Sequence, residues 1–160
     1  MTTIDFETAP SAIHPPAASD EFVLDLRLRA ARSATFSVRP LTGREVAVAV
    51  RYARDEGQDV RVDLSAMKRV VIDPRLRIAR VQPGVTTVEL ERAAAQFGLA
   101  PLVDGQTLVL ANLIAANVVL PDGELVAAGE ELLREIRTGR ARGIVVDATY
   151  RLHSAAELRR

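Results

Sequence analysis

The chain contains 160 residues, which is the size of one domain with a sizeable core. Its 21 basic and 21 acidic side chains cancel in formal charge, which excludes attraction to nucleic acid or to an anionic membrane through net charge. Cysteine is absent, which excludes disulfide bonds, thiolate catalysis and cysteine-ligated metals.

Residues 1–20 contain three of the eight prolines, among small and acidic residues. They are predicted to be disordered or to form an arm laid on a partner, and residues 21–160 are predicted to form one domain. Apolar residues occupy every second position from Phe22 to Leu28. This alternation predicts a half-buried strand as the first element of the domain.

The next elements predict a strand, a helix and a second strand. Residues 35–38 form the first strand, and residues 58–62 form the second. Between them, Thr42 and Glu45 have the spacing of a capping box, which predicts a helix that ends at Gly57. Two strands joined by a helix indicate a parallel pair with a crossover connection.

Residues 63–98 predict a hairpin followed by a helix. The hairpin turns at Asp73-Pro74, because proline fixes the φ angle that a tight turn needs. A second capping box, formed by Thr86 and Glu89, begins the helix. The rest of the chain predicts a loop at 100–106, a strand at 108–120, a turn at 121–124, a strand at 125–128, a helix at 130–138 and a strand at 143–152. The predicted fold class is α+β, with small mixed sheets packed against helices.

Four pieces of this pattern resemble, in the correct order, the flavin-binding domain of FAD-linked oxidases. This is the PCMH-type domain of the vanillyl-alcohol oxidase and berberine-bridge enzyme group. The pieces are residues 36–57, residues 63–98, residues 107–129 (with LANLIAANVVLPDGELVAAGE) and residues 132–153 (LLREIRTGRARGIVVDATYRLH). The resemblance implies a reduced PCMH-type domain.

Two glycine-rich loops that the resemblance would imply are missing, one after Val62 and one between Leu102 and Thr107. In the family the first loop gives backbone N–H groups to the pyrophosphate and often carries the histidine that bonds to the flavin. The substrate domain that follows this domain in the family is also expected to be absent. Losing about four charge-assisted hydrogen bonds, at roughly 1.5–3 kcal/mol each, predicts that no cofactor is bound, with FAD as the alternative.

The resemblance implies that a remnant of the flavin site would use backbone contacts. These would come from Pro83, Gly84, Val85, Gly143, Ile144 and Val145. With both loops gone, the groove between the two segments is expected to be open and largely apolar. Asn112 and Asn117 lie in an apolar run and are expected either to satisfy backbone groups or to point into this ligand groove.

Arginine is frequent near residue 140, and there it predicts either an anion site or a solvated helix end. The residues concerned are Arg134, Arg137, Arg140 and Arg142. The only histidines, His14 and His153, are far apart and lack acidic partners at ligand spacing, so no metal site is predicted. No nucleophile, base and acid occur in an arrangement that identifies catalytic residues.

Three functions from different classes stay open. The first is a small-molecule-binding protein, or a non-redox enzyme of the cyclase or isomerase kind, that uses the vacated groove for a small apolar molecule. The second is an FAD-dependent oxidoreductase. The third is a non-catalytic interaction protein, in which a homodimer covers the exposed apolar edges. Neither a signal-peptide pattern nor a bilayer-long apolar run is present, so a cytoplasmic location is expected, without membrane or nucleic-acid partners.

Overall fold

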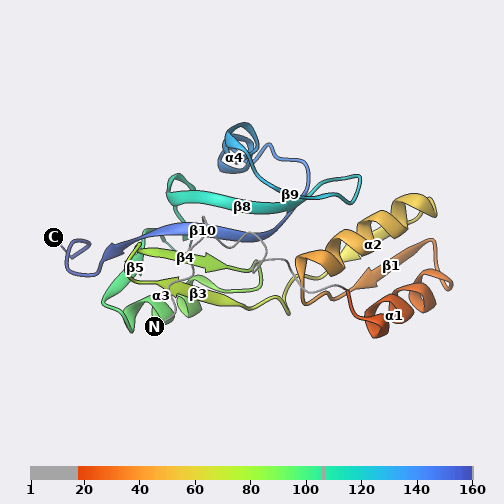
Figure 1. Cartoon of the computed structure of the whole chain (residues 1–160), viewed down its shortest axis with the longest axis horizontal. Coiled ribbons are helices and arrows are strands. Elements are labelled where there is room, and N and C mark those ends of the chain that lie inside the picture. Colours follow the sequence, from red (N-terminus) through yellow and green to blue (C-terminus); the bar gives the residue numbers. More distant parts are fainter. Residues whose placement is uncertain (1–17, 106, 160) are drawn as a thin grey trace.

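The computed structural model describes residues 18–105 and 107–159, which form two packed parts (Figure 1). The first part consists of α1 (Asp20–Ala30), β1 (Thr35–Val38), α2 (Gly43–Asp55) and β2 (Asp59–Val62). β1 and β2 pair in parallel, with Thr35 opposite Asp59, so the predicted crossover unit is confirmed. The Thr42 hydroxyl accepts a hydrogen bond from the Glu45 N–H and caps α2 as expected.

The first element is a helix, so the strand predicted for residues 22–28 is wrong. Ser19 caps α1, its hydroxyl accepting a hydrogen bond from the Phe22 N–H. The helix buries Leu26 and Ala30, which are four residues apart and lie on one face. Leu24 and Leu28, on either side of Leu26 in the alternating pattern, are exposed. The alternation of apolar residues therefore does not reflect alternating burial. Of the predicted tail, residues 1–17 lie outside the described residues, whereas Ser19 and Asp20 begin this helix.

The second part is an antiparallel sheet in the order β3-β4-β10-β8-β9, with β5 paired to the C-terminal end of β10. The strands are β3 (Val70–Asp73), β4 (Ile78–Val81), β5 (Leu99–Pro101), β8 (Leu113–Val119), β9 (Leu125–Ala127) and β10 (Ile144–Ser154). The helices α3 (Thr87–Ala95) and α4 (Glu130–Arg137) pack into one core cluster with this sheet. Together the two parts are of the α+β class that the sequence predicts.

The segment between α3 and β8 corrects two predictions. The loop expected at residues 100–106 contains strand residues of β5 and of β6 (Val103–Asp104), which pairs with β7 (Thr107–Leu108). The long strand expected at 108–120 begins only at Leu113, because a 3-10 turn, η1 (Leu110–Asn112), precedes it. An apolar run does not by itself distinguish a strand from a tight turn. Which of these residues form a strand depends on whether a neighbouring strand is available to pair with them.

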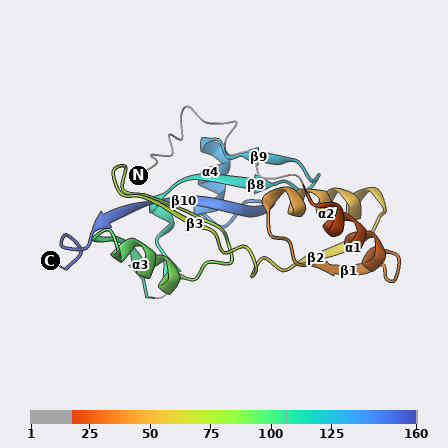
Figure 2. The same cartoon turned by 60° about the horizontal axis from the view of Figure 1, so that its bottom comes forward.

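The two parts meet at one end of the sheet, as both views show (Figure 2). Val46 and Ala47 of α2 belong to one buried cluster with Val119 of β8 and Val146 of β10. A Cβ at Gly43 would lie 2.8 Å from the Val146 side chain, so α2 approaches β10 closely at its first turn. Within the described ranges, no helix has the length and apolar character needed to cross a membrane.

Candidate functional site

The turn after β4 holds the first segment expected to contact flavin, residues 83–85. The Gly84 N–H donates to the Met67 carbonyl at 2.8 Å, and the Val85 N–H donates to the Gln82 carbonyl at 3.1 Å. Pro83 has no N–H group. The backbone donors of this segment are therefore occupied within the chain. A Cβ at position 84 would lie 2.7 Å from each of three carbonyl oxygens, those of Leu64, Ser65 and Met67.

The second expected segment, residues 143–145, lies against β8. Gly143 has a φ of 139°, and a Cβ there would lie 2.8 Å from the Val119 carbonyl oxygen. Ile144 and Val145 pair with Val119 and Val118 in the antiparallel ladder between β10 and β8. Glycine is required here because the chain enters β10 in close contact with its neighbour, in a conformation that other residues rarely adopt.

Met67 lies beside Gly84, in the connection between β2 and β3. Its side chain has no exposed surface and packs in one cluster with Val119 and Val146, while its backbone carbonyl accepts the hydrogen bond from Gly84. The space next to Gly84, in the seam between the two parts of the fold, is therefore filled by this side chain. The expectation that residues 83–85 and 143–145 contact a ligand stays a prediction.

A pyrophosphate does not fit the turn at Gly84. An anion of this kind needs several N–H donors, but carbonyl oxygens surround Gly84 and its own N–H is used. Asp63, two residues before Ser65, forms an exposed ion pair with Arg39 at 3.7 Å. A hydrogen bond from the Ser65 side chain, and next one from the Ser65 N–H, hold the pKa of Asp63 below its ordinary value. FAD held at this turn by the backbone of residues 83–85 would meet carbonyl acceptors rather than free N–H donors.

The two asparagines expected at a ligand groove lie on different elements and have different surroundings. The Asn117 amide nitrogen donates to both carboxylate oxygens of Asp147, at 3.1 and 3.0 Å. Arg80 donates to the same carboxylate at 2.8 Å, and the Arg80 and Asp147 side chains are only 19% and 18% exposed. Asn117 therefore belongs to a polar cluster across β4, β10 and β8. Asn112 ends η1, and its amide nitrogen is buried without a hydrogen-bond partner among the described residues.

The sequence did not single out Arg80, although Arg80 and Asp147 form the least exposed ion pair of the described chain. Only pairing between β4 and β10, which places Arg80 opposite Thr149, two residues along β10 from Asp147, brings these residues together. His153 pairs through its backbone with Ala100, and His14 lies outside the described residues. Over residues 18–105 and 107–159, no group of three or more potential ligands could hold a metal ion.

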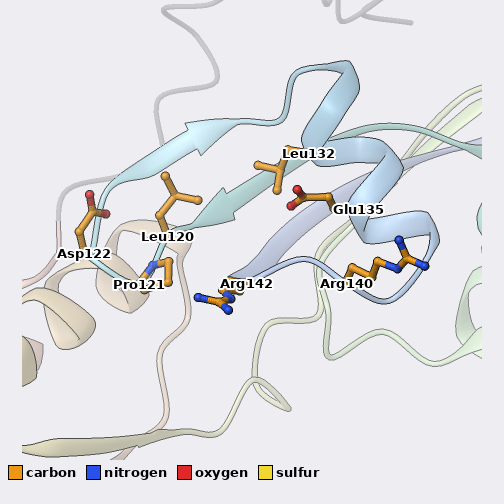
Figure 3. A pocket seen from close by; sticks show the side chains of 7 residues that line it. All are labelled: Leu120, Pro121, Asp122, Leu132, Glu135, Arg140 and Arg142. Carbon is orange, nitrogen blue, oxygen red and sulfur yellow. The ribbon is translucent and has the colours of Figure 1, made fainter.

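A pocket of about 480 Å³ lies between the β8–β9 turn, α4 and the segment that leads into β10 (Figure 3). Leu120 and Pro121 face Leu132 across it, and Arg140 and Arg142 lie along one side, Arg142 extending toward Pro121 and Arg140 toward the end of α4. The complete lining is Leu120, Pro121, Asp122, Leu132, Glu135, Arg140 and Arg142. Its volume falls in the range of small-molecule sites, about 300–1,000 Å³.

The side chains of the four arginines near residue 140 have different surroundings: two line the pocket, one binds a backbone carbonyl and one is exposed to solvent. Arg140 and Arg142 form no ion pair or side-chain hydrogen bond with any described residue. The Arg140 N–H donates to the Glu135 carbonyl at 2.8 Å, which fixes the pocket segment against α4. Arg137 donates to the Leu113 carbonyl at 2.6 Å. Arg134 is exposed on α4 outside the pocket.

This arrangement suits an anion that carries an apolar body. Each guanidinium offers several N–H donors in a planar fork that matches carboxylate, sulfonate or phosphate oxygens. Leu120 and Pro121 supply apolar surface on the side of Arg142, and Leu132 supplies it on the side of α4. Glu135 lies across the pocket and opposes a second negative charge, which favours ligands with a single anionic group.

The chain matches the protein-family model described as FAD binding domain over residues 27–149. Its fold is similar to that of 6-hydroxy-D-nicotine oxidase from Arthrobacter nicotinovorans, with a TM-score of 0.67 and 20% identity over 88% of this chain and 42% of that one. Berberine bridge enzyme from Eschscholzia californica gives a TM-score of 0.66 and 18% identity over 88% of this chain and 41% of that one. No curated protein gave a sequence match. The chain thus spans about two fifths of the length of these structures.

Proposed function

We propose that this chain, which belongs to the family of FAD binding domains, is a small-molecule-binding domain. Its ligand lies in the Arg140–Arg142 pocket rather than in the seam beside Gly84. The ligand class is a small molecule with an apolar body and one anionic group. The observation that carries the proposal is that Arg140 and Arg142 have no ion-pair or side-chain hydrogen-bond partner among the described residues and line a pocket with apolar side chains, while Met67 fills the space beside Gly84.

Binding, rather than cyclisation or isomerisation, is the proposed activity. The described side chains that line the pocket are apolar, carboxylate or guanidinium, and its wall contains neither histidine nor a serine nucleophile. Such a wall can hold and orient a ligand by shape and charge.

A naphthalene sulfonate tests the pocket, because it joins an aromatic body to one anionic group and reports binding by fluorescence. Replacing both arginines (Arg140→Ala with Arg142→Ala) is expected to weaken binding by about tenfold or more, since charge-assisted hydrogen bonds are lost. Glu135→Gln is expected to strengthen binding, because it removes the opposing charge. Arg134→Ala is the matched control, since it removes an arginine of α4 outside the pocket. Equal affinity in the double variant and the wild type would contradict the proposal.

A second function, an FAD-dependent oxidoreductase, is favoured by the family match. It is tested by the absorption spectrum of the purified chain before and after incubation with FAD, followed by gel filtration. A flavin band that stays with the protein would support this function over the first. A protein that remains colourless, while still binding the sulfonate, would support the first.

A further inference from the structure

The outer face of α1 carries two leucines that no described part of the chain covers. Leu24 is 61% exposed and Leu28 is 53% exposed, although both are large and apolar. At 100° per residue they lie opposite the buried pair of Leu26 and Ala30, on the side of the helix turned away from the core. Their spacing of four residues makes them neighbours on the surface, so they form a continuous apolar stripe.

Charges of opposite sign stand at the two ends of this stripe. Asp20 and Glu21 lie in the first turn of α1, and Arg27 and Arg32 lie at its end. None of these four side chains forms an ion pair with another residue of the described ranges. The outer face of α1 is therefore acidic at one end, apolar in the middle and basic at the other.

We propose that α1 is a self-association surface, on which the same face of a second copy of this chain packs in the antiparallel direction. A pattern that is acidic, apolar and basic along one axis is complementary to itself when one copy is turned by a two-fold rotation. In this register Leu24 of each copy lies against Leu28 of the other. The acidic first turn of each then faces the Arg32 end of the other, and the two helix dipoles are antiparallel.

The size of the surface sets the expected strength. A helix of 11 residues is about 16 Å long, and a single helix pair of that length buries less than the roughly 1,200 Å² of a stable interface. The dimer is therefore expected to be weak and dependent on concentration. Figure 1 shows α1 at the outer end of the first part, away from α4, so association through it leaves the Arg140–Arg142 pocket open. This inference does not rest on the function of that pocket.

The molar mass of the full chain, measured by light scattering over a concentration series, tests the surface. The wild type is expected to rise from 17.3 kDa towards twice that mass as concentration increases. Leu24→Glu combined with Leu28→Glu is expected to stay at the mass of the monomer. Val88→Glu, at a 59% exposed position on α3, is the matched control and should associate like the wild type. A wild type that stays monomeric at millimolar concentration, or a double variant that still dimerises, would overturn the proposal.

The register is tested separately, because the chain has no cysteine of its own. A mixture of the Leu24→Cys and Leu28→Cys variants should form a mixed disulfide on oxidation. Each variant alone should cross-link much less, since identical positions in the antiparallel register are offset by four residues, about 6 Å along the helix axis. This readout does not depend on variants that carry a new charge. Equal cross-linking in the mixture and in each single variant would contradict the register and overturn the antiparallel pairing.

Discussion

Gly84 is the residue at which the turn after β4 departs most clearly from a phosphate-binding backbone. Three carbonyl oxygens stand 2.7 Å from the position of a Cβ there, so a methyl group forces the backbone of residues 64–67 to move. Gly84→Ala is expected to lower the free energy of unfolding by about 1–3 kcal/mol, measured by urea denaturation. Gly129→Ala is the control, because no atom lies within 4 Å of its Cβ position, and it should cost less than about 1 kcal/mol. A Gly84→Ala variant as stable as the control would show that the backbone around Gly84 accommodates a methyl group at little cost in free energy.

Asp147 holds two neighbours at once, and its loss leaves both without a partner. Arg80 and Asn117 each donate to its carboxylate, and Arg80 is largely covered. Asp147→Ala is expected to destabilise the chain by about 2–4 kcal/mol, because a covered guanidinium is left unpaired. Asp25→Ala breaks an exposed pair with Arg29, whose side chains are 55% and 53% exposed, and should cost at most about 0.5 kcal/mol. Similar losses in the two variants would mean that the cluster contributes no more than a surface ion pair.

Gly84 and Gly143 were expected to contact flavin through their backbone, and this role stays a prediction. The structure shows instead that the chain approaches other backbone atoms closely at both positions. What they approach could not be predicted, since the carbonyls at Gly84 come from a segment whose path depends on the whole seam. The hydrogen bonds of Asn117 could not be predicted either, because its partner Asp147 is 30 positions away in the sequence.

At the scale of elements, α3 begins with a capping box that also sets the ionisation of Glu89. Its carboxylate accepts a hydrogen bond from the Thr86 N–H, and Lys68 lies 2.9 Å away. The Thr86 N–H, followed by Lys68, lowers the pKa of Glu89 from 4.5 to about 2. A lowered pKa in the folded state adds stability that is present above pH 4.5 and is lost as the pH falls to about 2.

The Glu89→Gln variant should therefore lack this part of the acid dependence. We expect the wild type to lose its advantage over Glu89→Gln between pH 4.5 and about 2, as measured by the urea midpoint at each pH. Glu91→Gln, on the same helix and without a hydrogen bond among the described residues, serves as the control and should follow the wild-type profile. A constant difference between wild type and Glu89→Gln over this range would contradict the assignment.

Most elements were predicted correctly, and the exceptions are α1 and the segments on either side of residue 106. The capped helices α2 and α3 and the turn at Asp73 lie where the sequence placed them. α1 was predicted as a strand because alternating leucines outweighed the cap at Ser19 and the Asp25–Arg29 pair at helical spacing. Short apolar segments such as 108–113 carry no such signals, and their structure follows from the strands they pair with.

At the scale of the whole molecule, the order of elements predicted an α+β fold, and the four sequence pieces that resemble FAD-linked oxidases predicted its family. Each hairpin and the crossover unit follow from neighbouring residues, and together they restrict the topology strongly. The way in which the two parts close on each other did not follow from the sequence. It depends on how the short link between β2 and β3 packs, and nothing local shows that Met67 turns inward.

Met67 is the residue through which this closure can be tested. It is fully buried in the cluster that joins α2 to β8 and β10, so Met67→Ala opens a cavity at the seam and should cost about 2–5 kcal/mol. Met67→Leu nearly conserves the volume and should cost less than about 1.5 kcal/mol. Leu26→Ala, buried within the first part alone, is the comparison of similar size.

Amide hydrogen exchange separates the closure from a general loss of stability. If Met67 holds the two parts together, Met67→Ala should speed exchange in α2 and in the first half of β10 together, because both lose the same contact. Leu26→Ala should speed exchange in α1 and α2 more than in β10. Faster exchange confined to one part in the Met67→Ala variant would mean that the two parts are stable independently, and that the filled seam is a contact rather than the link between them.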